Sequence, residues 1–111
     1  MTVVLDGSNL TIEEVVKVAR NNSDVAVSND SWGRIEKCRE MIQVKIDSHE
    51  IMYGVTTGIG EFSEVVLDSE QLEDFQKFLI YSHAAGIGKP LDGEVVRAAM
   101  CGRINVHCNG N

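Results

Sequence analysis

Two side chains in this sequence could carry out acid–base chemistry: the phenol of Tyr53 and the imidazole of His83. Tyr53 opens the segment Tyr53–Gly60, in which three glycines alternate with β-branched and aliphatic residues. A phenol has a reference pKa of about 10, so it needs a positive or hydrogen-bonding environment to act as a base near neutral pH. Without further context, a lone tyrosine here is more commonly a half-buried aromatic at a helix end.

His83 lies four residues after Leu79, which puts both on the same side of a helix. An imidazole on that side can donate to or accept from a polar ring, although a hydrogen-bonded core histidine is the commoner outcome. Gly60 has no side chain, so it permits a ligand to approach the backbone closely. An ordinary turn glycine explains Gly60 equally well.

The cysteines and the other histidines do not indicate a metal site. Cys38, Cys101 and Cys108 are an odd number without repeating spacing, so reduced thiols are expected. Cys101 and Cys108 flank His107, but no C-x-x-C pair completes a zinc site, and we expect no metal. His49 and His107 are expected to be solvated or helix-end histidines.

The composition favours one small globular domain spanning residues 1–111 with a thin core. The net charge is −7, with 17 acidic and 10 basic residues and no run of Lys and Arg, so nucleic acid is not an expected partner. No window is apolar enough for a membrane span, and the segment Met1–Asp6 lacks the basic region and the long apolar run typical of a secretory leader. These features predict a cytoplasmic protein that does not bind membranes.

The first quarter of the chain predicts a strand, a helix and a second strand. A β-rich run over Thr2–Leu5 stops at the turn pair Asp6-Gly7. Thr11 and Glu14 have the spacing of a capping box, which predicts a helix that ends in the polar cluster 21–24. The short β-branched run 25–27 suggests a second strand that could pair with the first.

The remaining elements are predicted to be three helices and a loop. Ile35, Cys38, Ile42 and Ile46 recur with helical spacing, which predicts an amphipathic helix from about residue 31 to close to residue 49. The glycine-rich segment 53–60 suits neither helix nor regular strand and is predicted to be a loop. Asp68 and Gln71 have the spacing of a capping box and predict a helix with Leu72, Phe75 and Leu79 on one face, which the glycines and proline at 86–90 end. Asp92 is predicted to cap a last helix, in which Val96, Met100 and Ile104 have helical spacing.

Three segments, taken in order, resemble the N-terminal region of the aromatic amino acid ammonia-lyases and the related aminomutases. They are Tyr53–Gly60, Ser82-His83-Ala84-Ala85-Gly86-Ile87-Gly88 and Arg103-Ile104-Asn105. The resemblance spans essentially the whole chain and implies a mainly α fold of about four amphipathic helices, two or three short strands and a glycine-rich active-site loop. The resemblance thereby implies the N-terminal domain of a fumarase/aspartase-like helical enzyme.

The same resemblance implies an electrophile that this sequence does not encode. Family members form MIO, 4-methylidene-imidazol-5-one, by cyclising an internal Ala-Ser-Gly, and no Ala-Ser-Gly occurs in these 111 residues. Family chains are also several times longer, with a C-terminal helical bundle that builds a homotetramer. The sequence therefore resembles an N-terminal fragment, expected to be inactive alone and to form a homo-oligomer in the whole enzyme.

The resemblance also assigns catalytic or substrate-binding roles to three residues and a supporting position to a fourth. Tyr53 matches the family's catalytic tyrosine on a lid-like loop, and Gly60 matches a catalytic-site glycine beside the substrate amino group. His83 matches a substrate-binding position that reads the substrate side chain. Asn105 matches a position that supports the active-site end of the bundle, although a polar helix face explains it equally well.

The implied reaction is elimination of ammonia from a small-molecule amino acid, with histidine as the first substrate because Ala84 follows His83. Tyrosine and phenylalanine remain open. Thr56 and Ile59 depart from the lyase pattern, and Val55-Thr56-Thr57-Gly58 also resembles the tyrosine aminomutases, so a 2,3-aminomutase is the alternative. A non-catalytic oligomerisation module with exposed apolar helix faces is a second alternative.

Overall fold

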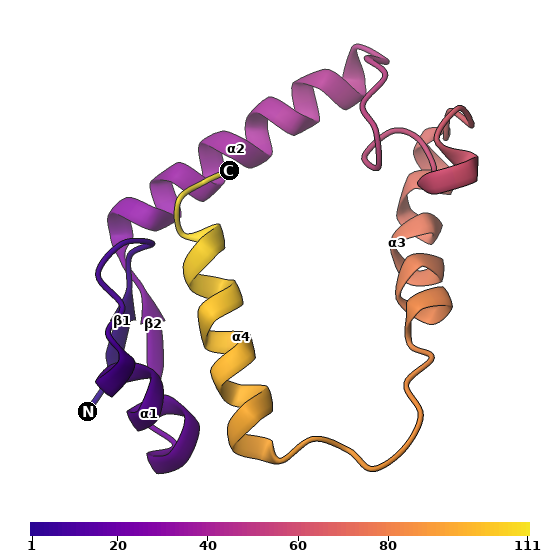
Figure 1. The fold of residues 1–111 in the computed structure, drawn as a ribbon. Helices are drawn as coiled ribbons and strands as arrows, with labels where there is room; N and C mark the ends of the chain where they lie inside the picture. Colours follow the sequence, from indigo (N-terminus) through magenta and orange to yellow (C-terminus); the bar gives the residue numbers. More distant parts are fainter. The chain divides into compact units, whose positions relative to one another are not determined.

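The computed structural model describes all 111 residues, and these form two compact units that we describe separately. The first unit contains Met1–Met41 and Lys89–Asn111, and the second contains Ile42–Gly88. The chain is mainly helical, as predicted, with four helices and two short strands (Figure 1). Their order is β1 (Val3–Leu5), α1 (Ile12–Asn21), β2 (Val25–Val27), α2 (Asn29–Asp47), the short 3-10 turn η1 (Gly60–Phe62), α3 (Ser69–His83) and α4 (Gly93–His107).

In the first unit, β1 and β2 form a parallel pair connected by α1. Val3 is in register with Val25, and Leu5 with Val27. The predicted capping box at the start of α1 is confirmed, since the Thr11 side chain accepts from the Glu14 amide and the Glu14 side chain accepts from the Thr11 amide. A helical crossover of this kind is the usual way to join neighbouring parallel strands.

The core of the first unit is thin, as predicted, and two cysteines belong to it. Its buried apolar cluster consists of Val3, Leu5, Val18, Cys101 and Cys108. Burial raises the pKa of the Cys101 thiol, so this group behaves as a small apolar side chain. The regularly spaced Val96, Met100 and Ile104 of α4 are exposed instead.

Arg34 of α2 forms hydrogen bonds that connect α2 with the turn after β1 and with the end of α4. The Arg34 guanidinium donates to the Cys108 carbonyl oxygen through Nε at 3.1 Å and through Nη2 at 2.9 Å. Nη2 also donates to the Asp6 carbonyl at 2.9 Å and to Ser31 Oγ at 2.8 Å. Asn105 Oδ1 accepts from the Gly7 amide at 3.0 Å, which gives Asn105 a local role in holding the turn after β1.

The turn after β1 contains a carboxylate whose pKa is lowered by hydrogen bonds. The Asp6 carboxylate accepts from the Asn9 side chain and from the backbone amides of Ser8 and Asn9, and these bonds lower its pKa from 3.8 to about 2. A carboxyl with a lowered folded-state pKa stabilises fully above its unfolded pKa and loses that contribution as the pH falls towards the folded value. We therefore expect Asp6→Asn to flatten the fall in the free energy of unfolding of the 111-residue chain between about pH 4 and pH 2. Urea titrations at several pH values measure this slope, and an unaltered slope in the variant would contradict the assignment.

Helix ends differ in detail from the predictions. α3 begins with the predicted capping box of Asp68 and Gln71, but it ends at His83, before the glycines that were expected to stop it. Asp92 occupies the N-cap position of α4, yet its side chain makes no capping hydrogen bond, so that part of the prediction is wrong. The backbone carbonyl of Asp92 instead accepts from the amides of Val95 and Val96. None of the helices is both long and apolar enough to cross a lipid bilayer.

Candidate active site

The glycine-rich segment is a loop, as predicted, and two buried threonines organise it. Thr56 is 5% exposed, and its hydroxyl accepts from the Met52 amide at 2.8 Å and donates to the Glu50 carbonyl at 2.9 Å. Thr57 is 1% exposed, and its hydroxyl accepts from the Gly54 amide at 3.2 Å. The same Thr57 hydroxyl donates to the carbonyl of the residue that follows it, at 2.9 Å. Threonine hydroxyls commonly bond to nearby backbone in turns, and here this explains why β-branched residues occur in a loop.

The loop is tied to the segment that leads into α3. Thr57 forms an antiparallel bridge with Val66, and the Leu67 amide donates to the Thr56 carbonyl at 2.9 Å. The Gly58 amide donates to the Val65 carbonyl at 3.1 Å. The base of the loop is therefore held by a short antiparallel pairing between residues 56–58 and residues 65–67.

Gly58 is needed where the loop turns back on itself. A Cβ at this residue would lie 2.6 Å from the Phe62 carbonyl oxygen and 2.7 Å from the Phe62 Cβ. Gly58 does not have a positive φ, so the requirement for glycine is one of space. Glycine is favoured at residue 60 because of its backbone conformation and not because of space. The φ of Gly60 is +58°, and nothing lies within 4 Å of an added Cβ.

Tyr53 lies at the exposed part of this loop. Its side chain is 68% exposed, which contradicts the alternative of a half-buried aromatic. The phenol oxygen accepts a hydrogen bond from the Gly60 amide at 3.2 Å. Two of the residues singled out from the sequence are therefore in direct contact.

His83 is the last residue of α3 and is exposed, so it is not a core histidine. Its Nδ1 lies 2.8 Å from the Leu79 carbonyl oxygen and 3.1 Å from Ser82 Oγ. Because a carbonyl oxygen can only accept, the bond to Leu79 requires the proton on Nδ1. In the neutral ring, Nε2 is then left as an acceptor.

His83 and the loop share an open apolar depression of about 340 Å³ within the second unit. Leu79 and Phe75 line it on the α3 side, which confirms the predicted common face with His83, and Gly58 and Ile59 line it on the loop side. Its other lining residues are Phe62, Val65, Leu67, Phe78 and Ser82. Tyr53 does not line the depression. Its phenol oxygen is hydrogen-bonded to the Gly60 amide, and Gly60 directly follows the lining residue Ile59.

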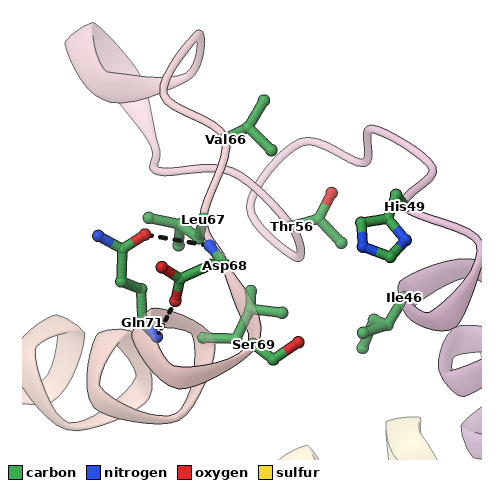
Figure 2. A pocket seen from close by; sticks show the side chains of 9 residues that line it. Ile46, His49, Thr56, Val66, Leu67, Asp68, Ser69 and Gln71 are labelled. Carbon is green, nitrogen blue, oxygen red and sulfur yellow. Dashed lines mark hydrogen bonds between the residues drawn. The ribbon is translucent and has the colours of Figure 1, made fainter.

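A second recess of about 360 Å³ lies on another side of the same loop, with Thr56 in its wall. Figure 2 shows the imidazole of His49 on one side of this recess and the capping pair of Asp68 and Gln71 on the other. His49 is exposed, and its Nδ1 lies 3.1 Å from the Asp47 carbonyl, just after the end of α2. This is the helix-end histidine that the sequence predicted.

The sequence singled out Tyr53, Gly60 and His83 but gave no role to the two threonines. In the sequence, Thr56 is a departure from the lyase pattern and, with Thr57, part of the segment that resembles the tyrosine aminomutases. The signal that could have identified Thr56 and Thr57 is a pair of consecutive threonines among glycines, because such hydroxyls stabilise turns by bonding the backbone.

Comparison with known proteins identifies the family and the fold of this chain. The sequence profile of the family described as aromatic amino acid lyase matches residues 10–111. A histidine ammonia-lyase from Caldanaerobacter subterraneus subsp. tengcongensis is 47% identical over 97% of this chain and 21% of its own length. The chain spans about a fifth of the length of the curated relatives that it matches.

Two solved structures have the same fold as this chain. The ergothioneine-degrading enzyme ergothionase from Treponema denticola superposes with a TM-score of 0.94 at 28% identity, over 99% of this chain and 22% of that one. Tyrosine aminomutase from Streptomyces globisporus superposes with a TM-score of 0.92 at 33% identity, over 99% of this chain and 21% of that one. With the family profile covering most of its residues, the chain belongs to the aromatic amino acid lyase family.

Proposed function

We propose that this chain is the N-terminal part of a histidine ammonia-lyase, a carbon–nitrogen lyase that eliminates ammonia from histidine to give an α,β-unsaturated acid. The observation that carries this proposal is the hydrogen bond between Tyr53 and the Gly60 amide. It presents an exposed phenol oxygen beside a glycine that leaves its surroundings open to a ligand. The 47% identity to a protein named histidine ammonia-lyase supports the choice of reaction.

Tyr53 is the proposed base. Elimination requires removal of the weakly acidic β-proton while the amino group departs, and the electron pair of the C–H bond becomes the new double bond. The phenol oxygen takes that proton in its deprotonated form. The Gly60 N–H stabilises negative charge on the same oxygen, and the open space around Gly60 allows the substrate amino group to approach.

His83 is proposed to recognise the substrate side chain. The bond from Nδ1 to the Leu79 carbonyl fixes the ring and leaves Nε2 to accept. An imidazole N–H or a phenol O–H can donate to that nitrogen, whereas a phenyl ring has no such donor. The apolar wall of Phe75 and Leu79 can receive the carbon face of a planar ring.

The family's electrophile, MIO, must come from chain outside these residues. The 111 residues contain no Ala-Ser-Gly, so they can supply the base and part of the substrate pocket but cannot form the group. When bound in the whole enzyme, MIO supplies the activation that turns the amino group into a leaving group. The part played by this chain is to hold the phenol, orient the ring and move one proton.

A tyrosine 2,3-aminomutase is the alternative function. It is favoured by the segment Val55-Thr56-Thr57-Gly58 and by the 33% identity to the Streptomyces globisporus tyrosine aminomutase. Such an enzyme returns the ammonia to the β-carbon rather than releasing it. Tyr53 as the base and His83 as the residue that recognises the substrate side chain would serve both reactions.

The test is product analysis with the full-length protein that contains these residues. We expect it to release ammonia from histidine, with the ultraviolet absorbance of urocanate appearing at the same rate. Tyrosine and phenylalanine are tested in parallel, with chromatography of the products. A β-amino acid without net release of ammonia would assign the aminomutase reaction instead, and an absence of turnover with all three amino acids would contradict both functions.

A further inference from the structure

Two buried hydroxyls hold the backbone on either side of Tyr53. The amide that donates to Thr56 belongs to Met52, and the amide that donates to Thr57 belongs to Gly54. These are the residues immediately before and after Tyr53. The side chain of Tyr53 is exposed and its one hydrogen bond is to the Gly60 amide, so its direction depends on how the backbone at residues 52–54 is held.

Each of these hydroxyls is engaged both as acceptor and as donor. Thr56 donates its proton to the Glu50 carbonyl, and Thr57 donates its proton to the Gly58 carbonyl. No buried side-chain nitrogen or oxygen atom in the chain lacks a hydrogen-bond partner. A hydroxyl whose single proton is used elsewhere can only accept from a further amide, which fixes the rotation of both side chains.

The threonines are themselves fixed to the segment that leads into α3. Thr57 is bridged to Val66, and the Thr56 carbonyl accepts from the Leu67 amide. Leu67 also lines the apolar depression that contains His83. A series of hydrogen bonds therefore connects the segment of Leu67, which lines the depression, through Thr56 and Thr57 to the backbone amides on either side of Tyr53.

We propose that Thr56 and Thr57 are positioning residues for Tyr53, and that their hydroxyl groups, rather than their methyl groups, set the direction of the phenol. The proposal rests on the proposed role of Tyr53 as base. It explains why two buried polar side chains occur in a loop whose apolar packing could have been supplied by valine, since valine has the same shape but cannot bond the two amides.

The test compares valine and serine at both positions in the full-length protein. Thr56→Val and Thr57→Val keep the branched shape and remove the hydroxyl, while Thr56→Ser and Thr57→Ser keep the hydroxyl and remove the methyl. Thr2→Val, at an exposed threonine, is the matched control. For each variant we measure kcat and KM, and hydrogen exchange of the Met52 and Gly54 amides by fragmentation mass spectrometry.

We expect each valine variant to lower kcat by about tenfold, because a displaced base loses rate while the pocket that binds the ring is intact. KM stays within about twofold, since Tyr53 does not line the depression. The amide released by each valine exchanges about tenfold faster or more, because its buried acceptor is gone. The serine variants and Thr2→Val stay close to the unsubstituted protein in both measurements.

Two results would overturn the proposal. One is valine variants that keep kcat and amide exchange unchanged, and the other is serine variants that lose as much kcat as the valine variants, which would assign the effect to the methyl groups. Failure of the proposed function gives a different pattern. In that case Tyr53→Phe leaves kcat unchanged, while the exchange of the Met52 and Gly54 amides still decides whether the hydroxyls hold the loop.

Discussion

Replacing Tyr53 by phenylalanine in the full-length protein is expected to lower kcat by roughly 10²- to 10⁴-fold, the range typical for loss of a general base. Phenylalanine keeps the ring and removes only the oxygen that accepts from the Gly60 amide. Because Tyr53 is exposed and outside the depression, the loss should fall on kcat rather than on KM. Initial rates of urocanate formation over a range of histidine concentrations measure both constants.

Tyr81→Phe is the matched control for this change. Tyr81 is the other tyrosine of the chain, is 72% exposed and packs edge-on against Phe78 at a ring-centroid distance of 6.5 Å. Phenylalanine preserves that ring contact, so we expect kcat within about twofold of the unsubstituted protein for this surface change. Equal rates for Tyr53→Phe and the unsubstituted protein would remove Tyr53 from the role of base.

Replacing Gly58 by alanine is expected to have the second largest effect. The added methyl would lie 2.6 Å from the Phe62 carbonyl oxygen, and because this neighbour is backbone, the loop itself must move. A displacement of about 1 Å at a catalytic group can reduce the rate about 100-fold, so we expect a loss of kcat of that order. We also expect a cost of about 1–3 kcal/mol in the free energy of unfolding, as for other overpacked sites. Kinetics of the full-length protein and urea titration of the 111-residue chain measure the two effects.

Gly33→Ala separates the clash at Gly58 from a general effect of losing a glycine. Gly33 lies inside α2, and nothing lies within 4 Å of an added Cβ. Alanine in a helix interior is favoured over glycine by about 1 kcal/mol, so stability should hold or rise and kcat should not change. If Gly58→Ala behaved like Gly33→Ala, the close approach to Phe62 would not constrain the loop.

The sequence by itself determined the local elements and the candidate residues. The capping boxes at Thr11 and Asp68 predicted where α1 and α3 begin, because a side chain that bonds the third residue of a helix acts over a few residues only. The glycine-rich composition of 53–60 predicted a loop for the same local reason. The resemblance then pointed to Tyr53, Gly60 and His83, and the family that it named is confirmed.

Only the tertiary structure decided which side chains meet. The Tyr53–Gly60 hydrogen bond, the two amides held by threonine hydroxyls and the space that requires Gly58 depend on how the loop folds back on itself. Burial at the C-terminal end of the chain was also decided by packing. Cys101 of α4 and Cys108, which follows α4, are buried in the core, whereas the regularly spaced Met100 is exposed. Propensity and capping depend on the residue types at a few adjacent positions. The path of the loop depends on several hydrogen bonds within residues 50–67 forming together, and the buried face of α4 depends on packing against β1, which is far away in the sequence, so neither can be read from a local pattern.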